Sequence, residues 1–350
     1  MANVNSASSG KVTLALFGVG RIGPIHLKSI ARHPRIRLKY LVEAVVDLAT
    51  KALDDVGLEG VTILHHTEVA KVFEDKSIHG VVLCTPTSTH QSLITQAMRA
   101  GKAVFCEKPL ALDSKTADEC YKVAEECKLP LLCAFNRRFD PTYANIIQRA
   151  RKGELGQVRY VKTTLRDTMD PNWEGLEKYL GTIASCWIDL AIHDVDLVCT
   201  VLGEFPTSIS AQGGAFHEAF KKNNDFDQAI INLKFASGAL ATIEMSRFCN
   251  YGYDQRLEVF GLGGMLEGAN FHDNHVVTAN GDGVSMPKYQ ASFDDRYAES
   301  YYNELDHFIR VVQGKEEKIC VTRKESVAAL RICEAAEKAN ATDSIVKLEW

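Results

Sequence analysis

The sequence predicts a parallel α/β sheet wrapped by helices, followed by a largely antiparallel second part. Three observations predict this. The chain has 350 residues, of which 46% are hydrophobic, enough to bury two cores. From Lys11 to about Phe135 short apolar runs alternate with amphipathic stretches, as in a doubly wound sheet. Beyond that point the runs are longer and alternate apolar with polar residues, which is typical of antiparallel strands.

The expected elements follow from these patterns. In the first part a helix begins near Pro24, an edge strand with its entry loop occupies residues 32–40, and the buried strands are 11–18, 40–47, 80–86, 102–109 and 130–136. In the second part the strands are 157–166, 227–235, 239–248 and 256–264, with "ASG" at 236–238 as a hairpin turn. Helices are expected over 185–200, 298–313 and 324–339.

Composition narrows the possible partners. The net charge is -5 and basic residues are dispersed, so we expect no nucleic-acid partner. No stretch approaches the ~20 apolar residues of a membrane span, and the polar start "MANVNSASSG" has no apolar signal core. The ten cysteines lack paired spacing and several lie in apolar runs, so we expect free thiols and a cytoplasmic protein.

A glycine-rich turn follows the first predicted strand. "LFGVGRIG" contains Gly18, Gly20 and Gly23 ahead of a helical pattern, the context of a dinucleotide-binding fingerprint. Gly18 permits the tight turn, Gly20 lets the backbone approach a pyrophosphate, and the helix start offers its N–H groups. The predicted cofactor loop comprises Gly18, Gly20, Arg21, Ile22 and Gly23. A merely structural turn is the alternative.

Asp47 closes the predicted strand "EAVVD", twenty-four residues beyond Gly23. The fingerprint places an acid about 20 residues on, where its carboxylate accepts hydrogen bonds from the ribose hydroxyls. Because this charge would repel a 2′-phosphate, NAD is favoured over NADP. The alternative is an ordinary residue of a turn at the end of a strand.

Two further segments follow predicted strands, where the carboxyl edge of a parallel sheet opens onto the ligand crevice. In "CTPTSTH" the hydroxyls of Thr85, Thr87 and Ser88 would serve the nicotinamide ribose or simply cap the next helix. In "CEKPL" Glu107 and Lys108 end a buried strand, where an unpaired charge is costly, so a bare salt bridge is the alternative to a functional role. The predicted cofactor contacts are Thr85, Pro86, Thr87, His90, Glu107 and Lys108.

A polar stripe crosses the apolar segment "SCWIDLAIHDVDLVCT", residues 185–200. On a continuous helix Ser185, Asp189, His193, Asp196 and Thr200 share one face. Asp189 and His193 are one turn apart, so the carboxylate would orient the imidazole as a general base. The alternatives are a solvated helix face and a metal site of Asp189, His193 and Asp196. We expect no metal, because a nicotinamide already supplies the electron sink.

With "GVGRIG", "CTPTSTHQSLITQAMRAGKAVFCEKPLA", "FNRRFDPTY" and "WIDLAIHDVD" in this order, the sequence resembles the Gfo/Idh/MocA family of NAD(P)-dependent oxidoreductases over nearly its whole length. The "EKP" segment is the specific element, since many enzymes share the glycine fingerprint. The segments "RIGPIH", "NRRFDP", "TTLRD" and the D-x-x-x-H helix are most similar to the inositol-oxidising members.

The resemblance implies an N-terminal Rossmann domain with a doubly wound parallel sheet and a C-terminal α+β domain with an open, mainly antiparallel sheet. We expect a flexible tail over residues 1–10, the NAD-binding domain over 11–134, and a substrate-binding and oligomerisation domain over 135–350. Family members associate through the second sheet, so the resemblance implies a homodimer or homotetramer.

The resemblance also implies the reaction and its residues. Lys108 corresponds to the catalytic lysine of the family, and Asp189 with His193 to its catalytic aspartate and histidine. The implied reaction is NAD-dependent oxidation of a secondary hydroxyl of a cyclic polyol, myo-inositol to 2-keto-myo-inositol. His193 and Asp189 would accept the proton and Lys108 would stabilise the alkoxide. The implied substrate-binding residues are Asn136, Arg137, Asp167, Asp196 and Tyr253.

One departure bears on the substrate. Family members commonly have glycines before the aspartate helix, whereas "LGTIASCWID" has Gly181 only. Another sugar, inositol isomer or trans-dihydrodiol is therefore an alternative substrate. A non-catalytic sensor of NAD and sugar is a second alternative. Such a sensor would have lost its catalytic groups, and Lys108, Asp189 and His193 are all present, so an enzyme is favoured.

Overall fold

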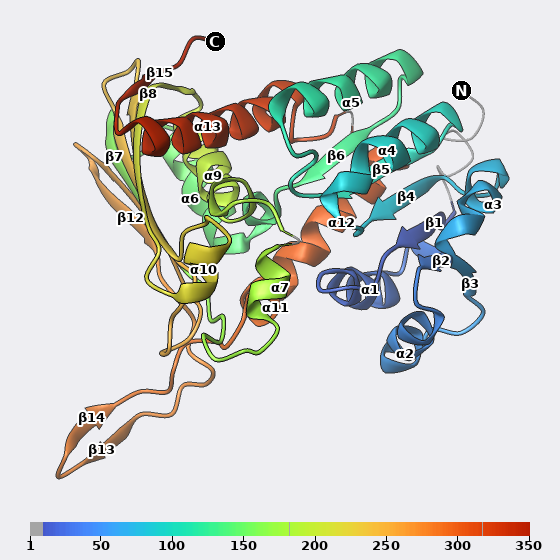
Figure 1. The fold of residues 1–350 in the computed structure, drawn as a ribbon, viewed down its shortest axis with the longest axis horizontal. Coiled ribbons are helices and arrows are strands. Elements are labelled where there is room, and N and C mark those ends of the chain that lie inside the picture. Colours follow the sequence, from blue (N-terminus) through green and yellow to red (C-terminus); the bar gives the residue numbers. More distant parts are fainter. Residues whose placement is uncertain (1–9, 182, 317) are drawn as a thin grey trace. The chain divides into compact units, whose positions relative to one another are not determined.

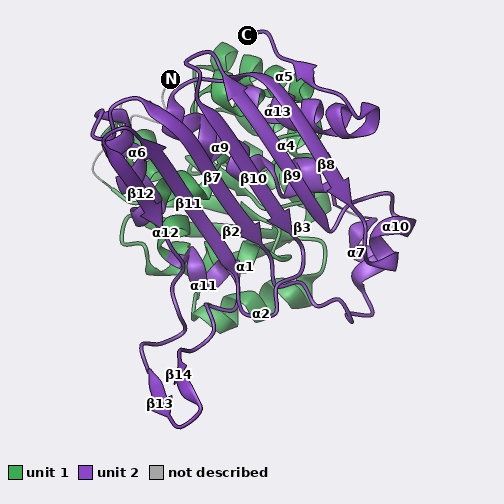
Figure 2. Ribbon diagram, turned by 90° about the vertical axis from the view of Figure 1, so that its left-hand side faces the viewer, with its two compact units in different colours: residues 1–139, 299–327 green, residues 140–298, 328–350 purple. Residues whose placement is uncertain are grey.

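The computed structural model describes residues 10–181, 183–316 and 318–350, and the chain divides into two compact units (Figures 1 and 2). Unit 1 runs to Phe139 and also includes Glu299–Val327, whereas unit 2 comprises Asp140–Ala298 and Ala328–Trp350. Unit 1 thus ends at Phe139 in its first segment, and it also takes in residues 299–327, which the expected boundaries assign to the second domain. The tail expected over residues 1–10 lies, except for Gly10, outside the described residues.

Unit 1 is built on a six-stranded parallel sheet in the order β3-β2-β1-β4-β5-β6. β1, β4, β5 and β6 are buried along their whole length, because helices flank a doubly wound sheet, and their sequences are therefore unbroken apolar runs. This confirms the predicted parallel sheet. Its strands are β1 (Val12–Phe17), β2 (Ile36–Glu43), β3 (Thr62–His65), β4 (Gly80–Leu83), β5 (Ala103–Glu107) and β6 (Leu131–Ala134).

The helices of unit 1 include one from the C-terminal third of the chain. This helix, α12 (Ala298–Val312), belongs here because the Phe308 ring lies 5.8 Å from that of Phe105 on β5, and Tyr301 lies 5.6 Å from His26 on α1. The other helices are α1 (Gly23–Arg32), α2 (Val46–Val56), α3 (Val69–Glu74), α4 (His90–Arg99) and α5 (Ser114–Cys127), with 3₁₀ turns η2 (His66–Glu68), η3 (Thr87–Thr89) and η4 (Asn136–Phe139).

Unit 2 holds a seven-stranded sheet in the order β12-β11-β7-β10-β9-β8-β15. Neighbouring strands in this sheet are antiparallel, except for the parallel pair β7 and β10, which confirms the mainly antiparallel sheet. The strands β9 and β10 form the expected hairpin. The strands are β7 (Val158–Arg166), β8 (Pro206–Gly214), β9 (Gln228–Phe235), β10 (Leu240–Ser246), β11 (Asp254–Gly261), β12 (Gly264–Gly268) and β15 (Val346–Lys347).

Helices α6 and α9 contact one face of this sheet, and its opposite face is turned to the viewer in Figure 2. A small hairpin of β13 (Thr278–Asn280) and β14 (Gly283–Ser285) extends from unit 2. The helices are α6 (Pro141–Arg151), α7 (Leu176–Leu180), α8 (Cys186–Asp189), α9 (Ile192–Leu202), α10 (Glu218–Lys222), α11 (Phe293–Arg296) and α13 (Arg323–Thr342), in which the chain passes from unit 1 to unit 2.

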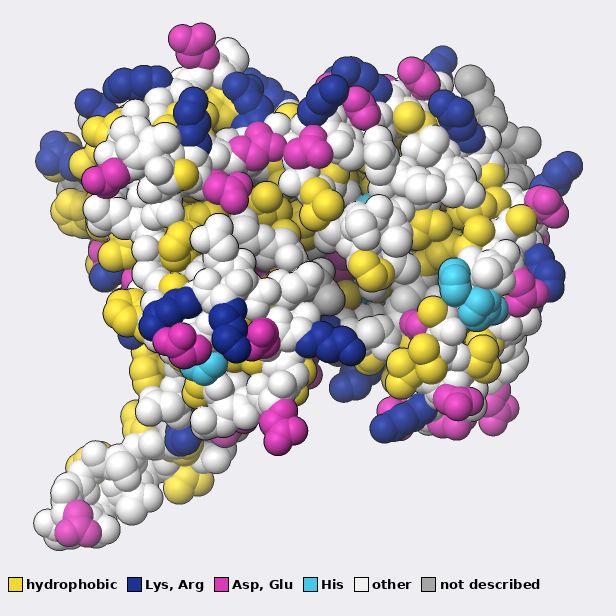
Figure 3. All heavy atoms as spheres, in the orientation of Figure 1, with side chains coloured by type: hydrophobic (Ala, Val, Ile, Leu, Met, Phe, Trp, Pro, Cys, Tyr) yellow, Lys and Arg dark blue, Asp and Glu magenta, His cyan; other side chains and the backbone are white. Residues whose placement is uncertain are grey.

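The surface agrees with the dispersed charges of the sequence. On the face drawn in Figure 3, Lys and Arg side chains lie interspersed with Asp and Glu side chains. Within the described ranges, no helix combines the length and the apolar character that a membrane span needs.

Candidate active site

The glycine loop after β1 has the geometry of a phosphate-binding turn. Gly18 has a φ of +86°, and a Cβ there would lie 2.8 Å from the carbonyl oxygen of Cys84. A Cβ on Gly23, the first residue of α1, would lie 2.2 Å from the Gly18 carbonyl oxygen. At Gly20, by contrast, nothing lies within 4 Å of the Cβ position, so the backbone is open to a ligand. Together with the N-terminus of α1, this loop fits the pyrophosphate of a dinucleotide.

The acid at the end of the second strand is Glu43, not Asp47. β2 ends at Glu43, and Asp47 is an exposed residue in the first turn of α2. Glu43 Oε2 accepts a hydrogen bond of 2.8 Å from the N–H of Val19 in the glycine loop. Its other oxygen accepts from the N–H groups of Ala44 and Val45. The prediction that Asp47 closes the strand is therefore wrong, since the apolar run "AVV" continues from the strand into the helix.

The loop after β4 is held by its own hydroxyl groups. Thr85 Oγ1 and Thr89 Oγ1 are 2.7 Å apart, and the Thr89 hydroxyl donates to the carbonyl oxygen of Pro86 at 2.8 Å. Neither η3 nor α4 has a side-chain cap, so the alternative that these hydroxyls cap the next helix is wrong. Thr85, Pro86 and Thr87 remain predicted cofactor contacts.

Two further predicted cofactor residues, His90 and Glu107, form hydrogen bonds that join neighbouring segments of unit 1. His90 is 1% exposed, and its ring nitrogens lie 3.0 Å from the Pro109 carbonyl oxygen and 2.9 Å from the Thr85 carbonyl oxygen, which joins the loops after β4 and β5. Burial lowers the pKa of His90. Glu107 is 6% exposed, and its two oxygens bind His26 Nε2 at 2.6 Å and the Lys108 N–H at 3.1 Å.

Three other predicted residues follow the carboxyl ends of neighbouring strands of unit 1. Lys108 is half-buried directly after β5 and precedes Pro109 through a cis peptide bond. Asn136 and Arg137 begin η4 after β6 and are buried. Because β5 and β6 are parallel and paired, the structure brings these residues to the same edge of the sheet as the glycine loop.

The helix of the polar stripe is interrupted in unit 2. α8 ends at Asp189 and α9 begins at Ile192. Between them the Ala191 N–H bonds the carbonyl of Cys186, five residues earlier, at 3.0 Å, which widens the turn. The prediction of one continuous helix is therefore wrong, and the residues of α9 do not continue the face that the residues of α8 define. Asp194 and Asp196 are 1% and 2% exposed, which also excludes the solvated-face alternative for these two carboxylates.

Asp189 is paired with a residue that the sequence analysis missed. Arg247 follows β10, is 1% exposed, and places Nη1 3.0 Å from Asp189 Oδ2. Burial alone would lower the pKa of Arg247, but the nearby carboxylates, Asp189 foremost, raise it above its ordinary value. The one available signal was its register, because Arg247 continues the buried set of alternate residues on β10.

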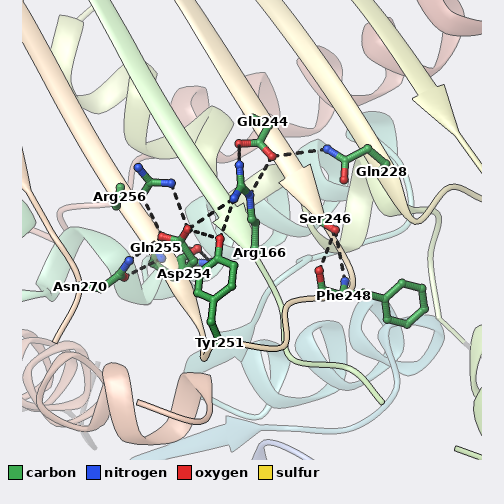
Figure 4. A network of polar contacts seen from close by, with 10 residues as sticks. All are labelled: Arg166, Gln228, Glu244, Ser246, Phe248, Tyr251, Asp254, Gln255, Arg256 and Asn270. Carbon is green, nitrogen blue, oxygen red and sulfur yellow. Dashed lines mark hydrogen bonds and ion pairs between the residues drawn. The ribbon is translucent and has the colours of Figure 1, made fainter. Parts of the chain in front are cut away.

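The same alternation brings Asp167 and Tyr253 to the inner face. Asp167 follows β7, which pairs in parallel with β10, and its N–H donates to the Ser246 carbonyl at 2.8 Å. Tyr253 precedes β11, and its ring lies 6.1 Å from that of Tyr297. The preceding residue of β7, Arg166, points to the opposite face, where it joins the polar network of Figure 4.

Comparison with known proteins covers both units. Residues 12–135 match the oxidoreductase family with an NAD-binding Rossmann fold, and residues 143–267 match the GFO/IDH/MocA C-terminal domain. The inositol 2-dehydrogenase of Rhizobium meliloti strain 1021 is 36% identical over 93% of this chain and 96% of its own. The scyllo-inositol 2-dehydrogenase (NAD(+)) of Bacillus subtilis strain 168 is 33% identical over 87% of each chain.

Solved structures of related dehydrogenases have the same fold as this chain. The crystal structure of a myo-inositol dehydrogenase from Corynebacterium glutamicum matches with a TM-score of 0.89 at 30% identity, covering 97% of this chain and 99% of the other. This likeness confirms the Rossmann domain followed by the open sheet.

Proposed function

This chain belongs to the Gfo/Idh/MocA family of NAD-dependent oxidoreductases, and from that premise we propose that it oxidises myo-inositol to 2-keto-myo-inositol. The observation that carries the proposal is the likeness to inositol 2-dehydrogenase over nearly the whole of both chains, at 36% identity. Enzymes of this kind act on CH–OH groups, and the glycine loop of unit 1 fits the NAD that such a reaction requires.

Oxidation of a secondary alcohol needs a hydride acceptor, a base that takes the hydroxyl proton, and a group that stabilises the developing negative charge on the alkoxide oxygen. The glycine loop would hold NAD, which would supply the acceptor for the hydride of the carbon that carries the hydroxyl group. His193 takes the hydroxyl proton, and Asp189 stabilises the imidazolium that results. Lys108 places positive charge against the alkoxide oxygen. The buried Arg247 supports this assignment, because its guanidinium contacts Asp189 at 3.0 Å and an adjacent positive charge favours the ionised carboxylate.

The substrate hydroxyls have suitable polar groups available. Asp167 and Asp196 are 7% and 2% exposed, and carboxylates accept hydrogen bonds from hydroxyl groups. Asn136 is 2% exposed, and its Nδ2 has no hydrogen-bond partner among the described residues, so this donor suits a hydroxyl oxygen. Arg137 and Tyr253 complete the proposed substrate-binding set.

The test is initial-rate NADH formation with NAD and a panel of myo-inositol, scyllo-inositol, chiro-inositol, glucose, xylose and a trans-dihydrodiol. We expect myo-inositol to give the highest kcat/KM. A higher value for scyllo-inositol or a sugar would keep the reaction and overturn the substrate. No turnover of any compound, together with tight NADH binding, would overturn the enzyme in favour of a sensor of NAD and sugar.

We further propose that two or four copies associate through the sheet of unit 2. Its outer face carries exposed apolar side chains, which fits an interface: Ile230, Leu240, Phe260 and Met265. Phe260→Asp is expected to give a monomer in size-exclusion chromatography with light scattering. A monomeric natural protein at micromolar concentration would overturn this proposal.

We also propose a cytoplasmic location. All ten cysteines are free thiols, which suits a reducing compartment. Fractionation of the producing cell, with detection of the protein by antibody, would test this location, and recovery outside the cytoplasm would overturn it.

A further inference from the structure

Three ionisable side chains meet in the interior of unit 1. His26 comes from α1, Glu107 from the end of β5 and Glu304 from α12, and they are 0%, 6% and 0% exposed. Their nearest nitrogen and oxygen atoms all lie within 4.8 Å of one another. The rings of Phe105 and Tyr301 flank the His26 ring at 5.0 and 5.6 Å, so the cluster is bordered by aromatic surface.

Both carboxyl oxygens of Glu107 have hydrogen-bond partners, whereas those of Glu304 have none among the described residues. Glu107 Oε1 lies 2.6 Å from His26 Nε2, and Oε2 accepts from the N–H of Lys108 at 3.1 Å. Both carboxyl oxygens of Glu304 are buried and have no hydrogen-bond partner among the described residues. An ionised carboxylate in this position is strongly disfavoured. Burial, and then the charge of Glu107, accordingly raise the pKa of Glu304 well above its ordinary value.

We propose that Glu304 carries a proton in the folded protein and that the His26–Glu107–Glu304 cluster is a positioning device for Lys108. With Glu304 neutral, Glu107 is the single carboxylate of the cluster, and its charge strengthens the hydrogen bond to the Lys108 backbone. The positioning role rests on the proposed function, because it matters only if Lys108 acts on the substrate. The proton on Glu304 stands independently of that function.

The titratable groups that the structure places near Glu304 form no hydrogen bond with it. They are His26 from α1, Glu107 from β5 and the Cys84 thiol that follows β4. Burial, and then the charge of Glu107, raise the pKa of Cys84 well above its ordinary value, so this thiol stays neutral. A proton is therefore the simplest group that removes the second negative charge.

A divalent metal ion is the other candidate, since imidazole and carboxylates are metal ligands. Ligand atoms ~2.0–2.2 Å from a tetrahedral zinc ion lie ~3.3 Å apart. His26 Nε2 and Glu107 Oε1 are only 2.6 Å apart, which is the separation of a short hydrogen bond. The geometry thus favours the proton, and the metal becomes an outcome of the test.

The first test measures the proton on Glu304 without any turnover. A carboxyl group with a raised folded-state pKa contributes stability below its unfolded pKa that is lost as the pH rises toward the folded value. Glu304→Gln keeps the shape of a protonated carboxyl but cannot ionise. Its melting temperature relative to the natural protein is therefore expected to rise between about pH 5 and about pH 8. An infrared band of a protonated carboxyl should also disappear in this variant.

Glu299→Gln is the matched control, because Glu299 lies on the same helix with a side chain 60% exposed. It should show neither effect. A difference between Glu304→Gln and the natural protein that does not change with pH would overturn the proton. Elemental analysis that finds about one divalent metal ion per chain, lost in Glu304→Gln, would also overturn it.

The second test concerns Lys108. Glu107→Gln removes the charge that holds the Lys108 N–H, so it is expected to lower kcat at least about tenfold while the Kd of NADH changes less than about twofold. Glu107→Asp restores the charge and should recover part of kcat. Unchanged kcat in Glu107→Gln would overturn the positioning role. Failure of myo-inositol as substrate would leave the pH dependence of Glu304→Gln as expected, so the two failures are distinguishable.

Discussion

Arg247 Nη1 lies 3.0 Å from Asp189 Oδ2, and this ion pair joins a guanidinium that is 1% exposed to a carboxylate that is 21% exposed. The removal of such a cation from water costs several kcal/mol. Asp189 foremost, and then Asp167 and Asp225, add negative charge near Arg247 and raise its pKa. A guanidinium in contact with a carboxylate favours the ionised form of that carboxylate, which is the form that can stabilise an imidazolium.

Arg247→Met is therefore expected to lower the free energy of unfolding by about 3 to 5 kcal/mol, because it leaves buried carboxylates without their cation. Arg247→Lys keeps the charge but replaces the planar guanidinium that places Nη1 on Asp189. We expect it to retain most of the stability and to lower kcat about tenfold or more. Urea denaturation and initial rates measure the two effects.

Arg166→Lys is the control for Arg247, since Arg166 lies on the opposite face of a neighbouring strand and is 32% exposed. It should change the free energy of unfolding by about 1 kcal/mol or less and leave kcat unchanged. A normal kcat in Arg247→Lys would mean that Asp189 needs no fixed partner.

Hydrophobic patterning predicted most of the fold. Strands that are buried on both faces of a parallel sheet consist of unbroken apolar runs, as β4 and β5 do, and such runs are visible in the sequence. The same signal failed at Asp47. An apolar run that leaves a strand and enters the first turn of an amphipathic helix shows no change of composition, so pattern alone cannot find the boundary at Glu43.

The arrangement of the candidate site could be predicted from the sequence less completely than the fold, for two reasons. The interruption between Asp189 and Ile192 contains neither glycine nor proline, so it arises from packing and not from a local signal. Arg247 was missed because its partner Asp189 is 58 residues away, and only the folded sheet brings the two together. Motif resemblance predicted roles for Lys108 and Asp189 but carried no information about the residues that contact them.

Lys108→Ala is expected to lower kcat about 100- to 1000-fold, because it removes a positive group from the developing alkoxide. The Kd of NADH, measured by fluorescence titration, should change much less, since the glycine loop is untouched. Lys115→Ala, an exposed position at the start of α5, is the matched control and should behave like the natural protein. Near-normal turnover of Lys108→Ala would remove this residue from the mechanism.

Asp254 is expected to make the free energy of unfolding of unit 2 fall as the pH is lowered into the acid range. Burial would raise its pKa, but hydrogen bonds from Arg256, Tyr251 and Asn270 hold the pKa below its ordinary value (Figure 4). A carboxylate with a depressed folded-state pKa contributes stability above its unfolded pKa that is lost as the pH falls through the folded pKa. Asp254→Asn should therefore be less stable by about 2 kcal/mol near neutral pH, with the difference shrinking below about pH 4. Urea denaturation across this range measures it, and a constant difference would contradict the assignment.

Glu43 is expected to select NAD over NADP. It ends β2 twenty residues after Gly23, the spacing of a ribose-binding acid, and it already contacts the glycine loop through the Val19 N–H. Glu43→Gln removes the charge that would repel a 2′-phosphate, so the ratio of kcat/KM for NAD over NADP should fall about tenfold or more, or ~1.4 kcal/mol. Asp47→Asn makes the same chemical change at an exposed residue of α2 and should leave the ratio within about twofold. If Asp47→Asn changed the ratio and Glu43→Gln did not, the ribose would have to bind against the first turn of α2 and not against the end of the strand.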